Sequence, residues 1–167
     1  SPLGLRTEDE RVVVRLPASA PDPVDTVVAL TLGAEPEVLP LPSDGAHVTA
    51  SSAAADKPAA NVLDGSGRAV WSAAEAERTG LVEVDLGAAT AIAGFAFDEP
   101  NVWPRVRQRF RLEVAEGDTW KELASGQTVG HGHEANLPVV TARRFRLIVE
   151  REDGPPSIAE WRLYRSE

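Results

Sequence analysis

The sequence predicts an all-β fold of the sandwich or jelly-roll type. Two observations support this: short apolar runs recur at short spacing, and turn-forming residues separate them. Among its 167 residues the chain has 13 glycines and 13 prolines, which mark many turns. A third observation is the regular alternation at 109–114, R-F-R-L-E-V. Its apolar residues are expected to face the core, and Arg109, Arg111 and Glu113 the solvent.

The main part of the chain has seven such runs, each about as long as an ordinary strand. They are residues 81–86, 92–97, 109–114, 120–123, 137–140, 144–150 and 158–164. Between them, residues 53–60 indicate a turn or a helical wrap, and residues 72–80 a loop or one helical turn. No internal repeat interrupts this pattern.

The first 45 residues predict a separate unit. Residues 11–16 and 26–32 alternate as two strands, with Pro17, Pro21 and Pro23 in the turn between them. Because a lone hairpin is marginally stable, we expect it to belong to a larger sheet or to pack on the next domain. Residues 33–46 carry repeated prolines and favour an extended connection, so we expect domains at 1–45 and 46–167.

Charge and composition disfavour several classes of partner. The formal net charge of −9 repels phosphate backbones and anionic bilayers, so we expect no nucleic acid and no membrane as partners. The absence of cysteine excludes disulfides and thiol chemistry. A start at Ser1 without methionine, and without a signal-peptide pattern, suggests a cut or processed chain. No catalytic triad order or phosphate-binding glycine loop is present, and neighbouring acids such as Asp98 and Glu99 are typical surface pairs.

Six segments occur in the order and spacing of a known family. They are A-x-N-V-L-D-G at 59–65 with Trp71 following, V-D-L-G at 84–87, an aromatic strand at 92–97, G-D-T-W at 117–120, T-A-R-R-F-R-L at 141–147 and S-I-A-E-W-R-L-Y at 157–164. In these segments the chain resembles the discoidin-type, galactose-binding-like sandwich of coagulation-factor C domains and family 32 carbohydrate-binding modules. The resemblance implies a jelly roll over residues 46–167.

A second resemblance covers residues 1–40. V-V-V-R-L-P at 12–17 and the run at 20–32 are similar to the sandwich that follows the catalytic barrel in family 29 α-L-fucosidases, and A-S-G-Q-T-V-G at 124–130 is similar to a segment of their discoidin-type module. This implies the C-terminal part of a secreted or cell-surface fucosidase-like protein, whose barrel lies outside this sequence.

The resemblance implies a non-catalytic module that tethers the enzyme to galactose- or fucose-containing glycans. Two alternatives stay open: a structural module that packs on the barrel without binding sugar, and a chain that is itself a hydrolase.

The resemblance also implies a structural calcium site, since oxygen ligands from several loops suit this cation. Carried over by position, Asp64 and Glu160 would supply carboxylates, and Ala60, Ser66 and Ala69 backbone carbonyls. Ala69 replaces a threonine that is usual in the family, which removes a hydroxyl oxygen. The alternative is that Asp64 caps a turn and that Glu160 pairs with an arginine.

A tryptophan in the loop at 98–107 is the main candidate for sugar contact. Trp103, between Asn101 and Arg105, combines a flat apolar face with hydrogen-bond donors, as a sugar site requires. Arg107, at the end of the same loop, joins this set, although a solvated ion pair is its default role. The alternative is that Trp103 plugs the end of the sandwich or packs against the missing catalytic domain. For Trp71 and Trp120, by contrast, we expect burial in the core.

The segment G-H-G-H-E-A-N at 130–136 offers further donors. His131, His133 and Asn136 are candidates for contacting a sugar, and the alternative is a flexible loop with solvated histidines. The H-x-H pattern lacks the additional ligand that a zinc site needs at fixed spacing.

Overall fold

The computed structural model describes residues 4–8, 11–15, 46–102, 106–129 and 132–166. The chain forms two compact units, residues 1–37 and 38–167. In the first unit, β1 (Gly4–Glu8) pairs antiparallel with β2 (Arg11–Arg15). The strand predicted at 11–16 is therefore confirmed, but its partner β1 was missed. The partner that the sequence predicted, residues 26–32, lies outside the described residues.

The second unit is built from strands, which confirms the all-β prediction. Its elements are β3 (His47–Ala50), η1 (Ala59–Leu63), β4 (Trp71–Ser72), β5 (Thr79–Asp98), β6 (Arg107–Glu116), β7 (Thr119–Val129), β8 (His133–Glu150), β9 (Ser157–Ile158) and β10 (Glu160–Arg165). Among the described residues, η1 is the one helical segment, and no helix is long and apolar enough to cross a membrane.

The V-D-L-G segment is a bend inside one long strand rather than the end of a short one. The register of β5 on β8 shifts between Asp85 and Thr90. Gly87 has φ 76° and donates its backbone N–H to Asp85 Oδ1 at 2.8 Å. Across the bend, Arg143 Nε and Nη2 donate to the two oxygens of Asp85 at 2.6 and 2.8 Å, which lowers the pKa of that carboxyl. As a result, two predicted strands merge into β5.

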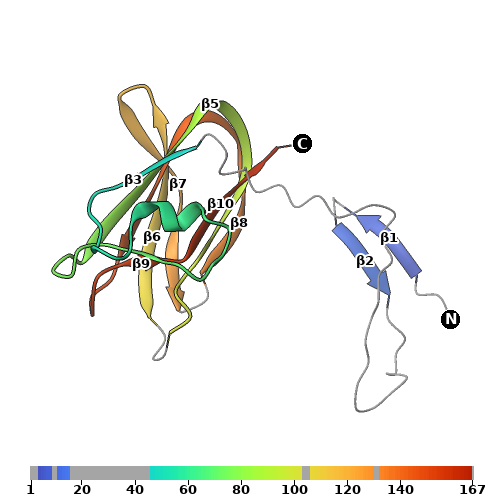
Figure 1. The fold of residues 1–167 in the computed structure, drawn as a ribbon. Helices are drawn as coiled ribbons and strands as arrows, with labels where there is room; N and C mark the ends of the chain where they lie inside the picture. Colours follow the sequence, from blue (N-terminus) through green and yellow to red (C-terminus); the bar gives the residue numbers. More distant parts are fainter. Residues whose placement is uncertain (1–3, 9–10, 16–45, 103–105, 130–131, 167) are drawn as a thin grey trace, which may run out of the picture. The chain divides into compact units, whose positions relative to one another are not determined.

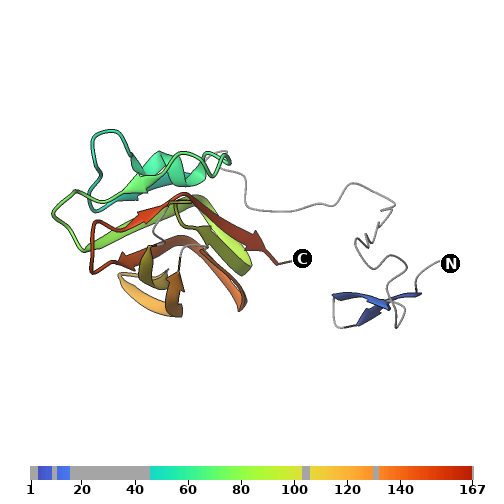
Figure 2. The same ribbon diagram turned by 90° about the horizontal axis from the view of Figure 1, so that it is seen from below.

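Because β5 and β8 bend, each takes part in both layers of the sandwich (Figure 1). The first half of β5 pairs with β3 and with the second half of β8, which β6 and β7 extend. The second half of β5 pairs with β10 and with the first half of β8. The short η1 helix lies against β3, β4 and β10, above the strands in Figure 2.

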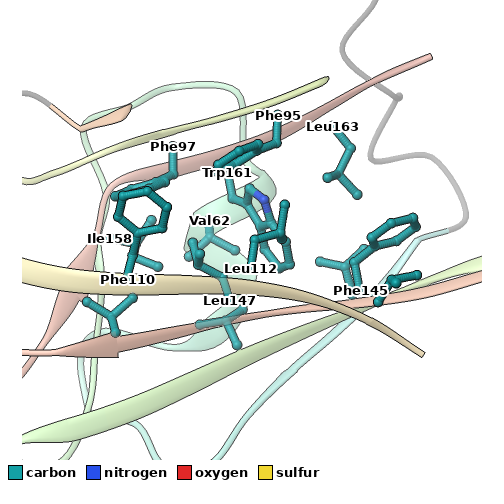
Figure 3. Packing of buried hydrophobic residues seen from close by; sticks show 14 of the residues in the cluster. Val62, Phe95, Phe97, Phe110, Leu112, Phe145, Leu147, Ile158, Trp161 and Leu163 are labelled. Atoms are coloured by element: carbon teal, nitrogen blue, oxygen red, sulfur yellow. The ribbon is translucent and has the colours of Figure 1, made fainter. Parts of the chain in front are cut away.

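The core fills the space between the two layers (Figure 3). Phe95 and Phe97 of β5 pack against Phe110 of β6 with ring centroids 6.0 and 5.1 Å apart. Val62 from η1 and Ile158 from β9 belong to the same buried cluster. Through these side chains, η1 and β9 are anchored in the core.

The two tryptophans expected in the core behave differently. Trp71 is fully buried, and its Nε1 donates to the Ser52 carbonyl at 2.9 Å, which confirms the prediction. Trp120 is only half-buried, so the prediction for it is wrong. The cations Arg144 and Arg146 lie over its ring, with Cζ 5.5 and 4.3 Å from the centroid. Its packing partners are thus guanidinium groups on the outer face of the sheet.

Glu113 also departs from the expected alternation. Its outward-facing side chain is covered by Arg111 and Arg146, whose Nε atoms each donate to it at 2.6 Å. The carboxylate is consequently buried although it lies on the outer face. Ion pairs are also formed by Arg143 with Asp85 and by Arg144 with Glu83, as expected for outward-facing arginines.

Candidate functional site

A hollow of about 580 Å³ lies among the loops at one end of the sandwich, a size typical of ligand pockets. We call it the loop hollow. Its apolar lining consists of Val70, Pro100, Val102, Val106 and Pro155. Val102 is 47% exposed, unusual for a large apolar side chain in this module. The loop hollow therefore offers apolar surface that a sugar ring could cover.

Polar groups from four stretches converge on the same hollow. The polar side chains are Lys57, Arg68, Ser72, Asn101, Arg151 and Ser157. Ser72 and Ser157 are cross-strand partners in the small β4–β9 sheet, so the pairing of these strands fixes one side of the hollow. The backbone N–H of Ser72 donates to the Lys57 carbonyl at 3.4 Å and holds that residue at the rim.

A tightly turned loop, residues 61–71, forms another wall. Asn61 Nδ2 donates to the Val70 carbonyl at 2.8 Å and closes the loop across its base. Within it, Ser66 Oγ accepts the backbone N–H groups of Arg68 and Ala69 at 3.1 and 3.4 Å. Arg68 directly follows these turns, so its position at the hollow depends on their geometry.

Glu160 links this loop to the last strand. Its Oε2 accepts the Gly67 N–H at 3.3 Å, and burial, together with the nearby Asp64 carboxylate, raises the pKa of Glu160 above its usual range. Asp64 Oδ1 accepts the Ser66 N–H at 2.8 Å, so it does cap a turn as the alternative had it. Glu160 bonds a backbone amide and forms no ion pair with a described arginine.

The oxygen atoms around Asp64 and Glu160 suit a hard cation. The carboxylates of Asp64 and Glu160 come from distant segments and lie near each other. Glu160, on β10, is also buried, which disfavours its charged form. A bound divalent ion would offset both effects, and carboxylate and carbonyl oxygens are its preferred ligands. Ala69 has no side-chain oxygen, and Ser66 Oγ already accepts two backbone N–H groups. Ser66 and Ala69, like Ala60, could therefore contribute only their backbone carbonyls as ligands.

Glu99 was expected on the surface, and this prediction is wrong. Its side chain is buried, and its Oε1 accepts hydrogen bonds from Gln108 Nε2 at 2.8 Å and from the Thr128 hydroxyl. Gln108 in turn bonds both backbone groups of Ser157 at 2.9 and 3.0 Å. This network of neutral donors ties β6, β7 and β9 to the start of the loop that carries Asn101.

The structure distributes the predicted sugar-binding residues over several places. Asn101 is exposed and lines the loop hollow. Arg107 lines a second hollow of about 410 Å³ near the ends of β5, β6 and β8, which we call the strand-end hollow. Asn136 is exposed on β8 opposite Gly94, and the lining of neither hollow includes it. Three further candidates lie outside the described residues: Trp103, Arg105 and His131.

His133 is not a solvated loop residue. It starts β8, is half-buried, and its ring centroid lies 4.6 Å from that of Phe110. It also packs near Phe95 and Phe97, with centroids 5.6 and 6.4 Å away.

Among the residues described, no group of three or more acidic, histidine or cysteine side chains gathers as metal-binding clusters do.

Sequence reasoning missed Lys57, Arg68 and Arg151 as site residues. The two hollows share Arg151, whose Nε donates to Asp153 at 2.6 Å. The one available signal was the position of Arg68 directly after the D-G-S-G turn.

The bent strands, the two-layer sandwich and the D-G loop joined to the last strand define a discoidin-type module. Residues 47–162 match the F5/8 type C domain, and the chain belongs to this family. A search of curated proteins gave no match.

Solved structures show the same fold. A family 29 fucosidase from Ruminococcus gnavus in complex with fucose is similar at 24% identity and a TM-score of 0.65, over 74% of this chain and 26% of that one. The family 32 module of NanJ from Clostridium perfringens, in complex with galactose, has 16% identity and a TM-score of 0.67, over 75% of this chain and 98% of that one. A further family 32 module from the same species, in complex with GalNAc-β-1,3-galactose, has 20% identity and a TM-score of 0.66, over 75% and 99%. This chain thus spans about a quarter of the fucosidase and nearly all of each binding module.

Proposed function

We propose that residues 46–167 form a non-catalytic carbohydrate-binding module of a secreted or cell-surface α-L-fucosidase-like glycoside hydrolase. The observation that carries the proposal is the loop hollow, in which apolar walls meet the donors of Asn101, Arg68 and Lys57. This combination is typical of small-molecule sites, and it occurs here on the fold of sugar-complexed modules. Galactose- or fucose-containing glycans are the proposed ligands.

The module would act by tethering. A catalytic barrel linked to a bound module experiences a high effective concentration of its glycan, without any new contact in the active site. The proposed partner is the barrel of the parent protein, and the likeness to the end of a much longer fucosidase supports this assignment. The chain itself carries no proposed chemistry.

We also propose that calcium binds between Asp64 and Glu160, with the carbonyls of Ala60, Ser66 and Ala69. Because Gly67 both contacts Glu160 and lines the loop hollow, the ion would stiffen one wall of the hollow. An ion that binds the folded state alone raises the melting temperature. A melting temperature that is the same in calcium and in chelator contradicts this proposal.

The test of glycan binding is an array of neutral and charged glycans probed with the 167-residue chain, followed by titration of each hit. Asn101→Ala should weaken binding of a hit at least about tenfold, since it removes a hydrogen bond that would leave a sugar hydroxyl unpaired. Asn136→Ala is the matched control, because this exposed asparagine lies outside the lining of both hollows.

Binding that Asn136→Ala weakens as much as Asn101→Ala would move the site elsewhere. An array without hits overturns the binding module in favour of a structural module that packs on the barrel. Turnover of an aryl fucoside by the purified chain would instead make it a hydrolase.

A further inference from the structure

The cations of the module without a carboxylate partner are grouped. In the described part of residues 46–166, most lysines and arginines lie within 4.0 Å of an acidic side chain. The described exceptions are Lys57, Arg68, Arg78, Arg107 and Arg165. Lys57 and Arg68 line the loop hollow, and Arg78 and Arg107 line the strand-end hollow. Arg165, near the end of β10, lines neither.

This grouping runs against the composition of the chain. With 26 acidic residues against 17 lysines and arginines, a surface cation has many available partners. Yet the described lining of the loop hollow holds three cations, Lys57, Arg68 and Arg151, and no carboxylate. Like charges that converge on one hollow repel each other, and a bound anion relieves that repulsion.

Arg151 connects the two hollows. Its ionic partner among the described residues, Asp153, has a side chain that is 72% exposed, whereas the Arg151 side chain is 20% exposed. An ion pair with so exposed a partner contributes little, so a ligand anion can replace or share it. The strand-end hollow itself is mixed, because Glu150, Glu152 and Asp153 join its arginines. The excess of positive charge therefore lies in the loop hollow.

We propose that the loop hollow recognises an anionic group on the glycan, a carboxylate or a sulfate ester, through Lys57, Arg68 and Arg151. Guanidinium groups bind such planar or tetrahedral oxyanions through paired N–H donors, and a lysine adds a compact charge. The apolar wall around Val70 and Val102 then covers the sugar ring that carries the anion. This inference rests on the proposed glycan binding and names the class of glycan.

The test uses matched pairs of oligosaccharides. One pair is the α-1,4-linked galacturonic acid trisaccharide and the α-1,4-linked galactose trisaccharide; the other is a fucose trisaccharide with and without sulfate esters. Calorimetric titration of the 167-residue chain should give at least about tenfold higher affinity for one anionic member than for its neutral counterpart, as expected for charge-assisted hydrogen bonds. The advantage should shrink with added salt.

The variants are Arg68→Gln and Lys57→Gln, with Arg165→Gln as the matched control. Each hollow variant should weaken the anionic ligand about tenfold more than the neutral ligand, because glutamine keeps a hydrogen-bond donor for sugar hydroxyls but removes the charge. The melting temperature should change little, because Arg68 is exposed, Lys57 is half-buried and neither forms an ion pair with a described residue. Arg165→Gln should leave both affinities unchanged. The pair that responds identifies the carboxylate or the sulfate as the recognised group.

The failures are distinguishable. Neutral trisaccharides that bind as well as their anionic partners leave glycan binding in place and overturn the anionic site. An Arg165→Gln effect equal to that of Arg68→Gln reduces the result to general charge attraction and also overturns it. If no oligosaccharide or array glycan binds, both the proposed function and this inference are wrong.

Discussion

Substitutions at Trp71 and Gly80 should have non-additive effects on the free energy of unfolding. A Cβ added at Gly80 would lie 2.6 Å from Trp71 Cη2, and 3.1 Å from both Ala73 Cβ and Pro156 Cγ. Real Cβ atoms do not approach a ring carbon this closely, so Gly80→Ala must displace a fully buried indole. Overpacking of this kind costs about 1–3 kcal/mol. For a module of this size, that corresponds to a melting temperature lower by about 4–12 °C.

The cost of Gly80→Ala depends on its clash with the Trp71 indole, and a second variant tests this dependence. Trp71→Phe removes the atom that the new methyl would strike, along with the hydrogen bond to the Ser52 carbonyl. Alone it should cost about 2–4 kcal/mol through the lost bond and the cavity. In that background, Gly80→Ala should cost at least about 1 kcal/mol less than it does in the parent chain, because part of the cavity is refilled.

Urea unfolding of the four proteins measures this coupling, provided that the slopes agree. Gly117→Ala serves as the control, because a Cβ there meets no atom within 4 Å and the cost arises from its φ of +61°. Its effect should add to that of Trp71→Phe within about 0.5 kcal/mol. If Gly80→Ala costs the same in both backgrounds, the packing argument fails.

Three further predictions concern charged groups. Burial raises the pKa of Glu160 above its usual range, and a protonated carboxyl no longer binds calcium, so the melting-temperature gain from calcium should shrink from about pH 7 to about pH 5. An equal gain at both pH values contradicts the site. In urea unfolding, Glu99→Ala should cost about 2–4 kcal/mol by orphaning buried donors, and Glu99→Gln clearly less. Arg146→Ala should cost about 1–2 kcal/mol through its lost carboxylate and Trp120 contacts, against less than about 0.5 for Arg165→Ala.

Local patterns predicted the fold well where one face of a strand decides the outcome. The alternation at 109–114 correctly placed Phe110 and its apolar neighbours in the core. The segment V-D-L-G was identified, but as the end of a strand. Its role as a bend depends on Arg143, which lies 58 residues away and meets Asp85 only after β5 and β8 pair. Long-range pairing of this kind leaves no signal in a local window.

Burial of polar groups was the least predictable property. Glu99 reads as a surface acid because its neighbours in the sequence are polar, yet Gln108 and Thr128 enclose it from two other strands. Trp120 was predicted in the core because it occupies a motif position that is buried in the family it resembles, yet arginines on β8 cover it from outside. In both cases, residues distant in sequence supply the environment.

The charged residues of the candidate site were equally hard to predict from the sequence. Spacing along the chain reveals where cations occur, and by that measure the arginines at 107–111 and 143–146 were the conspicuous group. In the fold, most of that group forms ion pairs with nearby carboxylates. Lys57 and Arg68, isolated in sequence, line the loop hollow and form no ion pair with a described carboxylate. A ligand anion responds to uncompensated charge, so recognition is expected at the inconspicuous pair.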